Sequence, residues 1–399
     1  MTISVDDRFD QDPFGRSSTL CFFLCPQVRA DVLGSGIVDV QAVVSVLIPS
    51  YNRAYCLARA IDSVLNQTYP GCHAVVIDDG STDSTDSLLA DRYGGNPRVQ
   101  VLRQSNQGVS IARNLGLANA SGDFIGFLDS DDQWDLDKAA MHLACFERLP
   151  EVGMICSDMA AVTSDGDLVQ QRYLRTMYGN YRRYPTQTVF ENCATLENLT
   201  QEPGRFTRNP NVYWGDIFSA MVTGSLVHTS TVLMRRERAL RAGPFDASFR
   251  CAGEDHDYHL RVCREGPVAF IDCPTIRYCV GHPDRLTRRS HMVYAAENFL
   301  RTMDLAFERD RDRIHVPRSI LRSAYGEAHG WLASELFETG DMAGTRRHAL
   351  QSLARAPLES RRTWTVLAAA SMPAQLRERL TAVYRRIKRR ALRLHDAGG

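Results

Sequence analysis

The sequence lacks several features that would place a chain of 399 residues in a simple class. Its 11 cysteines show no C-x-x-C pair and no regular spacing, which indicates reduced cytosolic thiols in small core sites rather than a disulfide framework. Lys and Arg total 47, as do Asp and Glu, and this balance argues against a nucleic-acid-binding protein. No apolar run reaches the roughly 18 residues that span a bilayer. We therefore expect a cytoplasmic protein, at most peripheral at the inner membrane face.

The first 42 residues show only weak patterning. A short apolar run at residues 20–25 follows Asp6, Asp7 and Asp10, whose charges do not suit a signal peptide. We treat residues 1–42 as an N-terminal extension of unknown role. The length of the whole chain favours a catalytic domain plus an appendage.

From residue 43 onward, short apolar runs alternate with amphipathic stretches. This alternation predicts an α/β protein with a mostly parallel sheet that helices cover on both faces. The segments expected to be strands are residues 43–48, 74–77, 99–102, 124–128, 153–164 and 225–235. The clearest expected helices are residues 54–66, 109–119 and 254–263.

Three polar clusters follow the first, second and fourth of these strands: residues 49–53, 78–83 and 129–132. Ligands of parallel α/β sheets bind beyond the carboxyl ends of the strands, so the clusters are expected to converge there. The first cluster is not a G-x-G-x-x-G sequence, which argues against a dinucleotide site.

Asp129, Asp131 and Asp132 would repel one another unless a cation lay among them. Mg²⁺ or Mn²⁺ suits such oxygen ligands and commonly bridges carboxylates to a diphosphate. The alternative is a solvated turn in which Asp132 caps the following helix. The position of these aspartates at the end of a buried strand favours the metal site over the solvated turn.

Other candidate residues lie in less distinctive surroundings. Asp78 and Asp79 suit hydrogen bonds to a nucleobase or ribose, or a simple turn around Gly80. Arg113 could bind a phosphate, pair with one of the acidic clusters, or form an ordinary structural ion pair. Asp255, at the start of a helix, suits a general base or a complement to the helix dipole, which would lower its pKa.

Three histidines are candidate metal ligands by their position in the sequence. His256 and His259 are three residues apart, but without a third ligand nearby they are expected to be surface or packing residues. His282 is in a loop near the end of the catalytic region. It could be a third metal ligand, or it could face solvent.

Taken together, these motifs resemble family 2 glycosyltransferases with the GT-A fold. The resemblance covers roughly residues 43–290 and rests on the following segments, in order and at the usual spacings: 44–53, 76–83, 106–114, 127–132, 243–246, 253–258 and 278–283. It implies direct displacement at the anomeric carbon of a nucleotide-diphospho-sugar, with inversion of configuration. It also implies a bacterial role in polysaccharide or cell-envelope synthesis.

The resemblance carries roles over to individual residues. It places Asp255 as the general base and Asp129 and Asp131 on the divalent metal, with His282 as a further candidate ligand. The residues expected around the nucleotide-sugar are Pro49, Tyr51, Asn52, Asp78, Asp79, Arg113, Asp129, Ser130 and Glu254. Two departures stand out: residues 279–281 replace the usual arginine before the loop histidine, and residues 170–222 have no clear family counterpart.

The remaining segments define the rest of the expected organisation. Residues 43–290 would be the catalytic domain, with residues 170–222 as an acceptor-side insertion or lid rich in aromatic residues. Residues 291–399 would be helical, with a helical hairpin around Gly340 and a basic amphipathic tail at 376–394 that suits contact with anionic lipid.

The function expected from all this is transfer of a sugar, most simply from a UDP-sugar, to a glycan or a lipid-linked acceptor. Two other classes remain to be weighed. A non-catalytic sugar-nucleotide-binding or scaffolding protein would share the fold, but the carboxylates at 129, 131 and 255 argue against it. A nucleotidyltransferase would need a Gly- and Lys/Arg-rich phosphate loop after the first strand, which residues 49–53 do not form.

Overall fold

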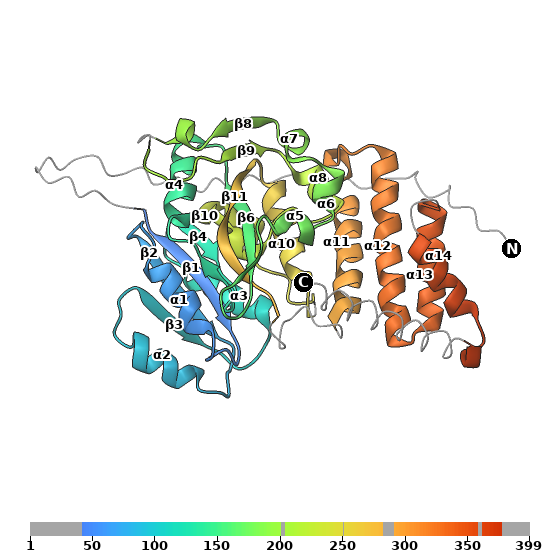
Figure 1. Ribbon diagram of the computed structural model, residues 1–399, viewed down its shortest axis with the longest axis horizontal. Helices are drawn as coiled ribbons and strands as arrows, with labels where there is room; N and C mark the ends of the chain where they lie inside the picture. Colours follow the sequence, from blue (N-terminus) through green and yellow to red (C-terminus); the bar gives the residue numbers. More distant parts are fainter. Residues whose placement is uncertain (1–41, 201–203, 250, 282–290, 358–360, 377–399) are drawn as a thin grey trace, which may run out of the picture. The chain divides into compact units, whose positions relative to one another are not determined.

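The computed structural model describes residues 42–200, 204–249, 251–281, 291–357 and 361–376. Its central feature is one mixed sheet in the order β3-β2-β1-β4-β10-β6-β11-β9-β8 (Figure 1). Six of these strands run in the same direction: β1 (Val44–Ser50), β2 (Cys72–Asp78), β3 (Val99–Arg103), β4 (Phe124–Phe127), β6 (Met154–Val162) and β11 (Val268–Cys279). The short β10 (Leu233–Arg235) runs antiparallel between β4 and β6.

The strands that lead to the polar clusters are buried because helices cover the sheet. Every residue of β1 and of β4 is buried, as expected for parallel strands covered on both faces. The connecting helices are α1 (Leu57–Leu65), α2 (Thr85–Tyr93) and α3 (Val109–Asn119). In the register, Ser50 pairs with Asp78 and Leu47 with Phe127, so the carboxyl ends of β1, β2 and β4 meet at one edge. The predicted convergence of the three clusters is confirmed.

Residues 170–222 contribute to the sheet as well as to its cover. Within this segment lie α5 (Leu174–Met177), α6 (Asn180–Arg183), α7 (Thr186–Val189), β8 (Asn192–Thr195), a 3-10 turn (Glu197–Leu199), β9 (Asn211–Gly215) and α8 (Phe218–Val222). β9 extends the sheet beside β11, and β8 follows it (Figure 1). Tyr181 and Phe190 both pack on Phe270 of β11. Several aromatic side chains of the segment therefore serve the core.

The expected strand at residues 225–235 is wrong over most of its length. Only Leu233–Arg235 pairs as a strand, and Thr229–Thr231 forms a 3-10 turn. Short side chains bond the local backbone here: the Thr231 hydroxyl donates to the carbonyl of His228 at 2.7 Å. Such bonds compete with a strand ladder. The turn carries His228 and Ser230 to the acidic cluster.

Two smaller strands and three helices complete the sheet-bearing part. β5 (Gln133–Trp134) pairs with β11, and β7 (Leu168–Gln170) pairs with β6. The helices are α4 (Lys138–Arg148), α9 (Arg236–Ala242) and α10 (Glu254–Arg264). The predicted α/β class, with co-directional strands flanked by helices, is confirmed.

The C-terminal region is helical, as predicted. It comprises α11 (Met292–Asp310), a 3-10 turn (Arg311–Arg313), α12 (Arg318–Thr339), α13 (Met342–Arg355) and α14 (Arg361–Ser371), which follow one another in Figure 1. α12 ends at Gly340, whose φ of 91° lies in the left-handed region, and Asp341 caps α13 by accepting from the amide of Gly344 at 2.9 Å. The predicted hairpin is therefore present. The basic tail at 376–394 lies, beyond residue 376, outside the described residues.

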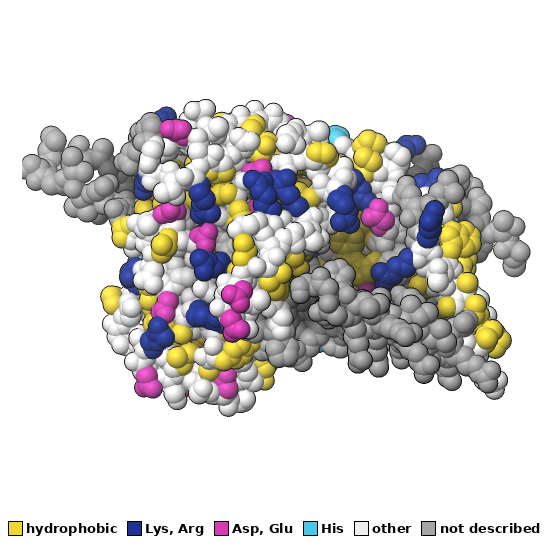
Figure 2. Space-filling view, in the orientation of Figure 1, with side chains coloured by type: hydrophobic (Ala, Val, Ile, Leu, Met, Phe, Trp, Pro, Cys, Tyr) yellow, Lys and Arg dark blue, Asp and Glu magenta, His cyan; other side chains and the backbone are white. Residues whose placement is uncertain are grey.

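The surface and the cysteines give two further facts. In the described part of the chain, no helix is long and apolar enough to cross a membrane. Cationic and anionic side chains are interspersed on the face drawn in Figure 2. Of the nine free cysteines in the described ranges, seven are buried, which agrees with thiols as core fillers.

Candidate functional site

The acidic turn at residues 129–132 follows β4 directly, and Asp132 is its buried member. The Asp132 side chain accepts from the hydroxyl of Ser230 at 2.6 Å and from the amide of Cys279 at 3.1 Å. Only 1% of Asp132 is exposed. The next helix, α4, begins at Lys138 after a strand, so the interpretation of Asp132 as a helix cap is wrong. Its carboxylate instead ties the turn to two distant segments.

Arg113 links the acidic turn to the start of α10, the helix that carries the candidate base. Its guanidinium donates to Asp129 Oδ1 at 3.0 Å and to Glu254 Oε1 at 2.8 Å. Arg113 is 3% exposed, and its guanidinium lies 5.4 Å from the ring centre of Phe245. Burial alone would lower the pKa of Arg113, but the carboxylates of Asp129, Glu254 and Asp255 raise it, so the cation is retained. Of the partners considered from the sequence, two carboxylates are in contact with Arg113, those of Asp129 and Glu254.

A second group of ligand atoms gathers around Asp129. One ligand atom each from Asp129, Asp132 and His228 lies within 4.8 Å of the others. Burial raises the pKa of Asp132 well above its usual range, and repulsion from Asp131 and Asp129 raises it further. Carboxylate oxygens and an imidazole nitrogen suit a divalent cation, and a cation would relieve this repulsion. The residues therefore fit the predicted metal.

Asp131 and Ser130 complete the acidic turn. Asp131 lies 3.7 Å from the guanidinium of Arg53, and the side chains of Arg53 and Asp131 are 11% and 18% exposed. Ser130 is buried. Asp131 thus faces the loop after β1, whereas the group around His228 lies toward the interior. Sequence reasoning missed His228 because it sits in a stretch taken for a strand.

Asp79 organises the loop that precedes α3. Its carboxylate accepts from the side chain of Gln104 at 2.6 Å, from the amide of Gln107 at 2.9 Å and from the amide of Gly108 at 2.9 Å. Asp78 accepts from the amide of Ser81 at 3.1 Å. Through these bonds both carboxylates hold the backbone of the second cluster and of the following loop in place. The side chains of Asp78 and Asp79 are both buried.

The first and second clusters are joined by Asn52. Its side-chain oxygen accepts from the amides of Thr82 at 2.7 Å and Asp83 at 3.3 Å, while its own amide donates to Ser81 Oγ at 2.9 Å. Asn52 has a φ of 53°, a left-handed conformation that asparagine tolerates better than most residues. Pro49 is buried at the end of β1, and Tyr51 is 44% exposed beside it. The clusters form one surface with an accessible aromatic side chain.

The candidate base, Asp255, lies in the first turn of α10. Burial would raise its pKa, but His259, Arg113 and His228 together hold the pKa below its usual value. Arg113 is the decisive partner because it stays charged, whereas burial lowers the pKa of His259 to about 3. The hydroxyl of Thr229 lies 3.4 Å from Asp255 Oδ2. Asp255 is therefore an ionised carboxylate beside the 228–231 turn.

The predicted histidines divide into two cases. His256 and His259 are buried on α10, so they pack in the interior, and the surface alternative is wrong. The ring of His256 lies 5.2 Å from that of Phe299 in α11. His282 lies outside the described residues.

α11 supports the turn that precedes the base. The side chain of Asn298 donates to the carbonyl of Ala252 at 2.6 Å. Gly253 has a φ of 91°, and a Cβ atom there would lie 2.9 Å from Asn298 Cβ. The close approach and the positive φ both require glycine. The C-terminal region thus contacts the segment that places Glu254 and Asp255.

The structure thus combines an α/β sheet with polar strand ends, an acidic turn after β4 and a separate carboxylate on α10, which is the arrangement that the motifs predicted. Residues 45–199 match the model of glycosyl transferase family 2. The chain carries a domain of that family, as its motifs had indicated.

Relatives support the same family over part of the chain. Chondroitin synthase of Pasteurella multocida (strain Pm70) is 36% identical over 131 residues, which cover 33% of this chain and 14% of that protein. Glycosyltransferase GlyA of Streptococcus pneumoniae serotype 4 is 38% identical over 181 residues, which cover 44% of this chain and 24% of that protein. The chain thus spans a quarter or less of these relatives. S. aureus TarS 1-349 in complex with UDP-GlcNAc has a TM-score of 0.47 and 15% identity, with 82% of this chain and 90% of that chain covered.

Proposed function

We propose that the protein transfers a sugar from a nucleotide-diphospho-sugar, most simply a UDP-sugar, to a hydroxyl of a glycan or lipid-linked acceptor, with inversion. The observation that carries this proposal is the Arg113 bridge. It brings the acidic turn after β4 and the helix that carries Asp255 to one guanidinium, although Asp129 and Glu254 lie far apart in the sequence. A donor site and a base must be adjacent for direct displacement.

The donor would bind across the three strand ends. Tyr51 offers an exposed aromatic surface for a nucleobase, and Pro49 and Asn52 set the backbone beside it. Asp78 and Asp79 would act mainly by holding the loops that surround the nucleotide. Ser130 and Asp129 would face the ribose and diphosphate side, and Glu254 would keep Arg113 in place.

A divalent ion, Mg²⁺ or Mn²⁺, would neutralise charge on the leaving diphosphate. Asp129 and Asp131 would hold it from the turn, and Asp132 and His228, whose ligand atoms gather with that of Asp129, would lie on its inner side. His282 stays a proposed ligand.

Asp255 would accept the proton of the acceptor hydroxyl. As that proton moves to the carboxylate, the acceptor oxygen forms a bond to the anomeric carbon, and the bond from that carbon to the diphosphate oxygen breaks. The electron pair leaves with the nucleoside diphosphate. A single displacement from the opposite face inverts the configuration, and the ionised state of Asp255 is the one such a base needs.

A panel of nucleotide sugars tests the proposal. The full chain is incubated with each donor and Mg²⁺ or Mn²⁺, and binding and slow donor hydrolysis are measured. Binding of at least one donor, strengthened by metal, is expected. If no donor binds with either metal, the proposal fails. If a donor binds but is never consumed with any glycan acceptor, the protein is a sugar-nucleotide-binding scaffold.

The relatives suggest which acceptors to include first. Chondroitin synthase and hyaluronan synthase are the names of two of them, so glycan acceptors precede lipid-linked ones in the panel. Contact of the basic tail with anionic lipid, and a location at the inner membrane face, belong to this same proposal.

The two sides of the acidic group can be separated by mutation. We expect Asp131→Asn to weaken Mn²⁺ binding, and with it metal-dependent donor binding, by about 100-fold or more. Asp131 is more accessible than Asp132 and could turn from Arg53 to an ion, whereas Asp132 is engaged by Ser230 and Cys279. Mn²⁺ titration followed by electron paramagnetic resonance measures the effect.

The matched variants are Asp132→Asn and His228→Asn. Both should reduce metal affinity less than Asp131→Asn does, and their melting temperatures report any loss of folding. Normal Mn²⁺ affinity in Asp131→Asn, together with loss in either matched variant, would move the ion to the inner group.

Asn298→Ala tests whether α11 positions the base. It leaves the carbonyl of Ala252 without its donor, which should cost about 1–3 kcal/mol of folding free energy. We expect kcat to fall severalfold while the KM for the donor stays unchanged, because only the turn before Asp255 shifts. Asn119→Ala is the control: Asn119 also donates to a backbone carbonyl, that of Leu115, but it is exposed on α3. A kcat equal to that of the control would show that α11 does not position Asp255.

A further inference from the structure

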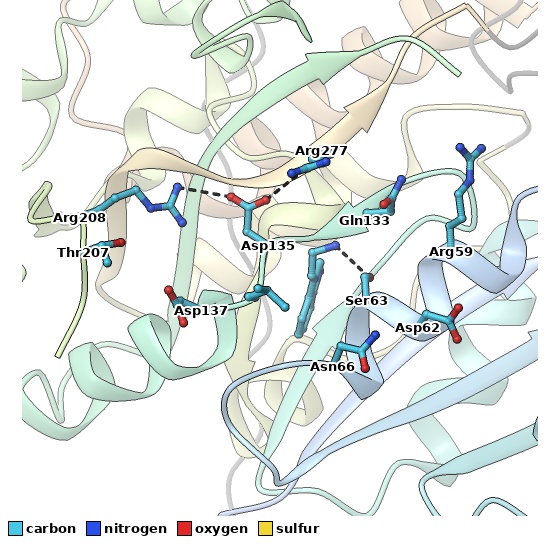
Figure 3. A pocket seen from close by; sticks show the side chains of 12 residues that line it. Arg59, Asp62, Ser63, Asn66, Gln133, Asp135, Asp137, Thr207, Arg208 and Arg277 are labelled. Atoms are coloured by element: carbon cyan, nitrogen blue, oxygen red, sulfur yellow. Dashed lines mark hydrogen bonds and ion pairs between the residues drawn. The ribbon is translucent and has the colours of Figure 1, made fainter. Parts of the chain in front are cut away.

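A cavity lies beside α1, and none of the residues that line it belongs to the three polar clusters. It has a volume of about 510 Å³, and its walls come from α1, from β5 with the turn after it, from residues 207–208 and from Arg277 of β11 (Figure 3). A volume of this size falls within the range of small-ligand sites. The side chains of Arg208, Asp135 and Arg277 lie together on one side of it, and those of Ser63 and Asn66 on the other (Figure 3).

The walls of this cavity are bonded to one another before any ligand binds. The buried side chain of Gln67 donates to the carbonyl of Asp135 at 2.8 Å and accepts from the amide of Ala139 at 2.9 Å. The amide of Thr68 donates to the carbonyl of Leu136 at 3.0 Å, and the amide of Trp134 donates to Ser63 Oγ at 3.0 Å. The cavity is therefore preformed, which lowers the entropic cost of binding.

The lining is polar but electrically balanced. Three arginines, Arg59, Arg208 and Arg277, face three aspartates, Asp62, Asp135 and Asp137. Asp135 lies 3.4 Å from Arg208 and 3.7 Å from Arg277, so much of this charge is already paired. Such a lining does not favour a polyanion such as a nucleoside diphosphate.

The rest of the lining offers hydrogen bonds. Ser63, Asn66, Gln133 and Thr207 supply donors and acceptors, and Leu136, 60% exposed, supplies an apolar surface. In this cavity only Leu136 and Trp134 are apolar. The adjoining cavity described below adds four small or medium apolar residues, Ala160, Val162, Leu168 and Pro274, beside the same charged cluster. Paired donors and acceptors beside a small apolar surface suit the alternating hydroxyl groups and C–H faces of a sugar ring.

The cavity continues past the Arg208–Asp135–Arg277 cluster. A neighbouring cavity of about 300 Å³ shares these three residues and extends toward Ala160 and Leu168. The side chains of Arg208 and Arg277 are 38% and 57% exposed, so both can reach a ligand from either side. Two adjoining cavities with a common polar wall suit a chain of several sugar units better than one compact ligand.

A short stretch of backbone connects this surface to the acidic turn. Gln133 and Trp134 line the cavity and follow Asp132 directly. The indole N–H of Trp134 donates to the carbonyl of Ser230, whose hydroxyl bonds Asp132. A ligand seated here would be held at a fixed position relative to the proposed donor site.

We propose that the paired cavities beside α1 bind a neutral oligosaccharide, the non-reacting portion of the acceptor glycan. The identification of that glycan as the acceptor rests on the proposed function, whereas glycan binding itself does not. Remote binding of this kind orients the acceptor and concentrates it at the site.

Saturation-transfer NMR on the full chain, without donor or metal, tests this proposal. The probes are short neutral oligosaccharides of glucose, galactose and N-acetylglucosamine, with uronic-acid-containing oligosaccharides as a second arm. We expect at least one neutral probe to bind at concentrations of about 1 mM, a standard binding free energy near −4 kcal/mol. Preference for the uronic-acid arm would overturn the choice of a neutral ligand, and no binding in either arm would overturn the site.

Two variants locate the binding. Asn66→Trp places a large side chain in the cavity and should abolish binding. Arg59→Ala, which removes a guanidinium that bonds only the Ser164 carbonyl among the described residues, should weaken binding about tenfold. Arg103→Ala is the control, because Arg103 is an exposed arginine paired with Asp86 outside the cavity.

The outcomes are separable from those of the donor panel. If the glycan binds Asn66→Trp and Arg59→Ala as tightly as it binds the control Arg103→Ala, the glycan binds elsewhere and the proposed site is overturned. If glycan binding follows the prediction but no nucleotide sugar binds, the proposed function fails and the glycan site stands. Nucleotide-sugar binding should be unchanged in Asn66→Trp and Arg59→Ala, since Arg59 lies within α1 and Asn66 at its C-cap, not at the strand ends.

Discussion

Asp255→Asn is expected to bind the donor and the metal normally and to lose transfer by about 10²–10⁴-fold, the usual contribution of a general base. An amide cannot accept the acceptor proton, but it is nearly isosteric: its single oxygen can still accept from the amide of His256, and its NH2 group can donate to the hydroxyl oxygen of Thr229. Donor binding is measured by calorimetry and transfer by release of the nucleoside diphosphate in the presence of acceptor. The two measurements separate chemistry from binding.

The pH dependence of kcat/KM is an independent test of the role of Asp255. The pKa of Asp255 is held below its usual value, so the carboxylate stays ionised as the pH falls to the ordinary carboxyl range. The acidic limb of kcat/KM should therefore lie below pH 4 in the wild type, with the base ionised at every higher pH. An acidic limb at pH 6 or above would point to a different group.

Asp257→Asn is the matched control for Asp255→Asn. Asp257 lies in the same first turn of α10, but its carboxylate pairs with Arg261 at 2.9 Å. We expect a small loss of stability and no change in the chemical step. Equal losses of transfer in the two variants would mean that the helix start matters for folding alone. Transfer at the wild-type rate in Asp255→Asn would remove it from the role of base.

Regular local patterns were sufficient to predict the frame of the site. The helix expected at 109–119 coincides with α3, and the run at 43–48 lies almost wholly in β1. Both segments combine a clear periodicity with burial, so local sequence and tertiary context agree. The meeting of the three clusters followed from the parallel direction of β1, β2 and β4 alone.

Long-range pairing placed residues that no local pattern identifies. His228 and Ser230 reach the acidic turn because β10 inserts between β4 and β6, which are far from it in sequence. The strands β8 and β9 were taken for irregular chain, since β8 is a largely exposed edge strand without clear alternation. The bonds of Asp79 to the 104–108 loop could not be predicted from local sequence, because they depend on how that loop folds back.

Arg113→Met is expected to destabilise the protein by about 3–5 kcal/mol, the usual cost of removing one partner of a buried ion pair. Methionine keeps the apolar stem of arginine but is shorter and uncharged, so it leaves Glu254, 5% exposed, without its cation. Burial and Asp255 already raise the pKa of Glu254, and only Arg113 opposes them strongly. In the variant this pKa rises further. A folded-state pKa above the unfolded value means that the folded protein holds the extra proton, so the loss of stability should grow as the pH rises from 5 to 8.

A double-mutant cycle shows whether the loss comes from the buried charge. Glu254→Gln removes that charge, so adding it to Arg113→Met should cost less than the two single changes combined, and the pH dependence of the variant should flatten. Denaturant unfolding at pH 5 and pH 8 measures all four proteins. Arg113→Lys keeps a cation but cannot span both carboxylates as the planar guanidinium does, so it should fall between wild type and Arg113→Met. Additive losses with no pH dependence would mean that Arg113 stabilises the site by packing on Phe245 instead of by joining Asp129 to Glu254.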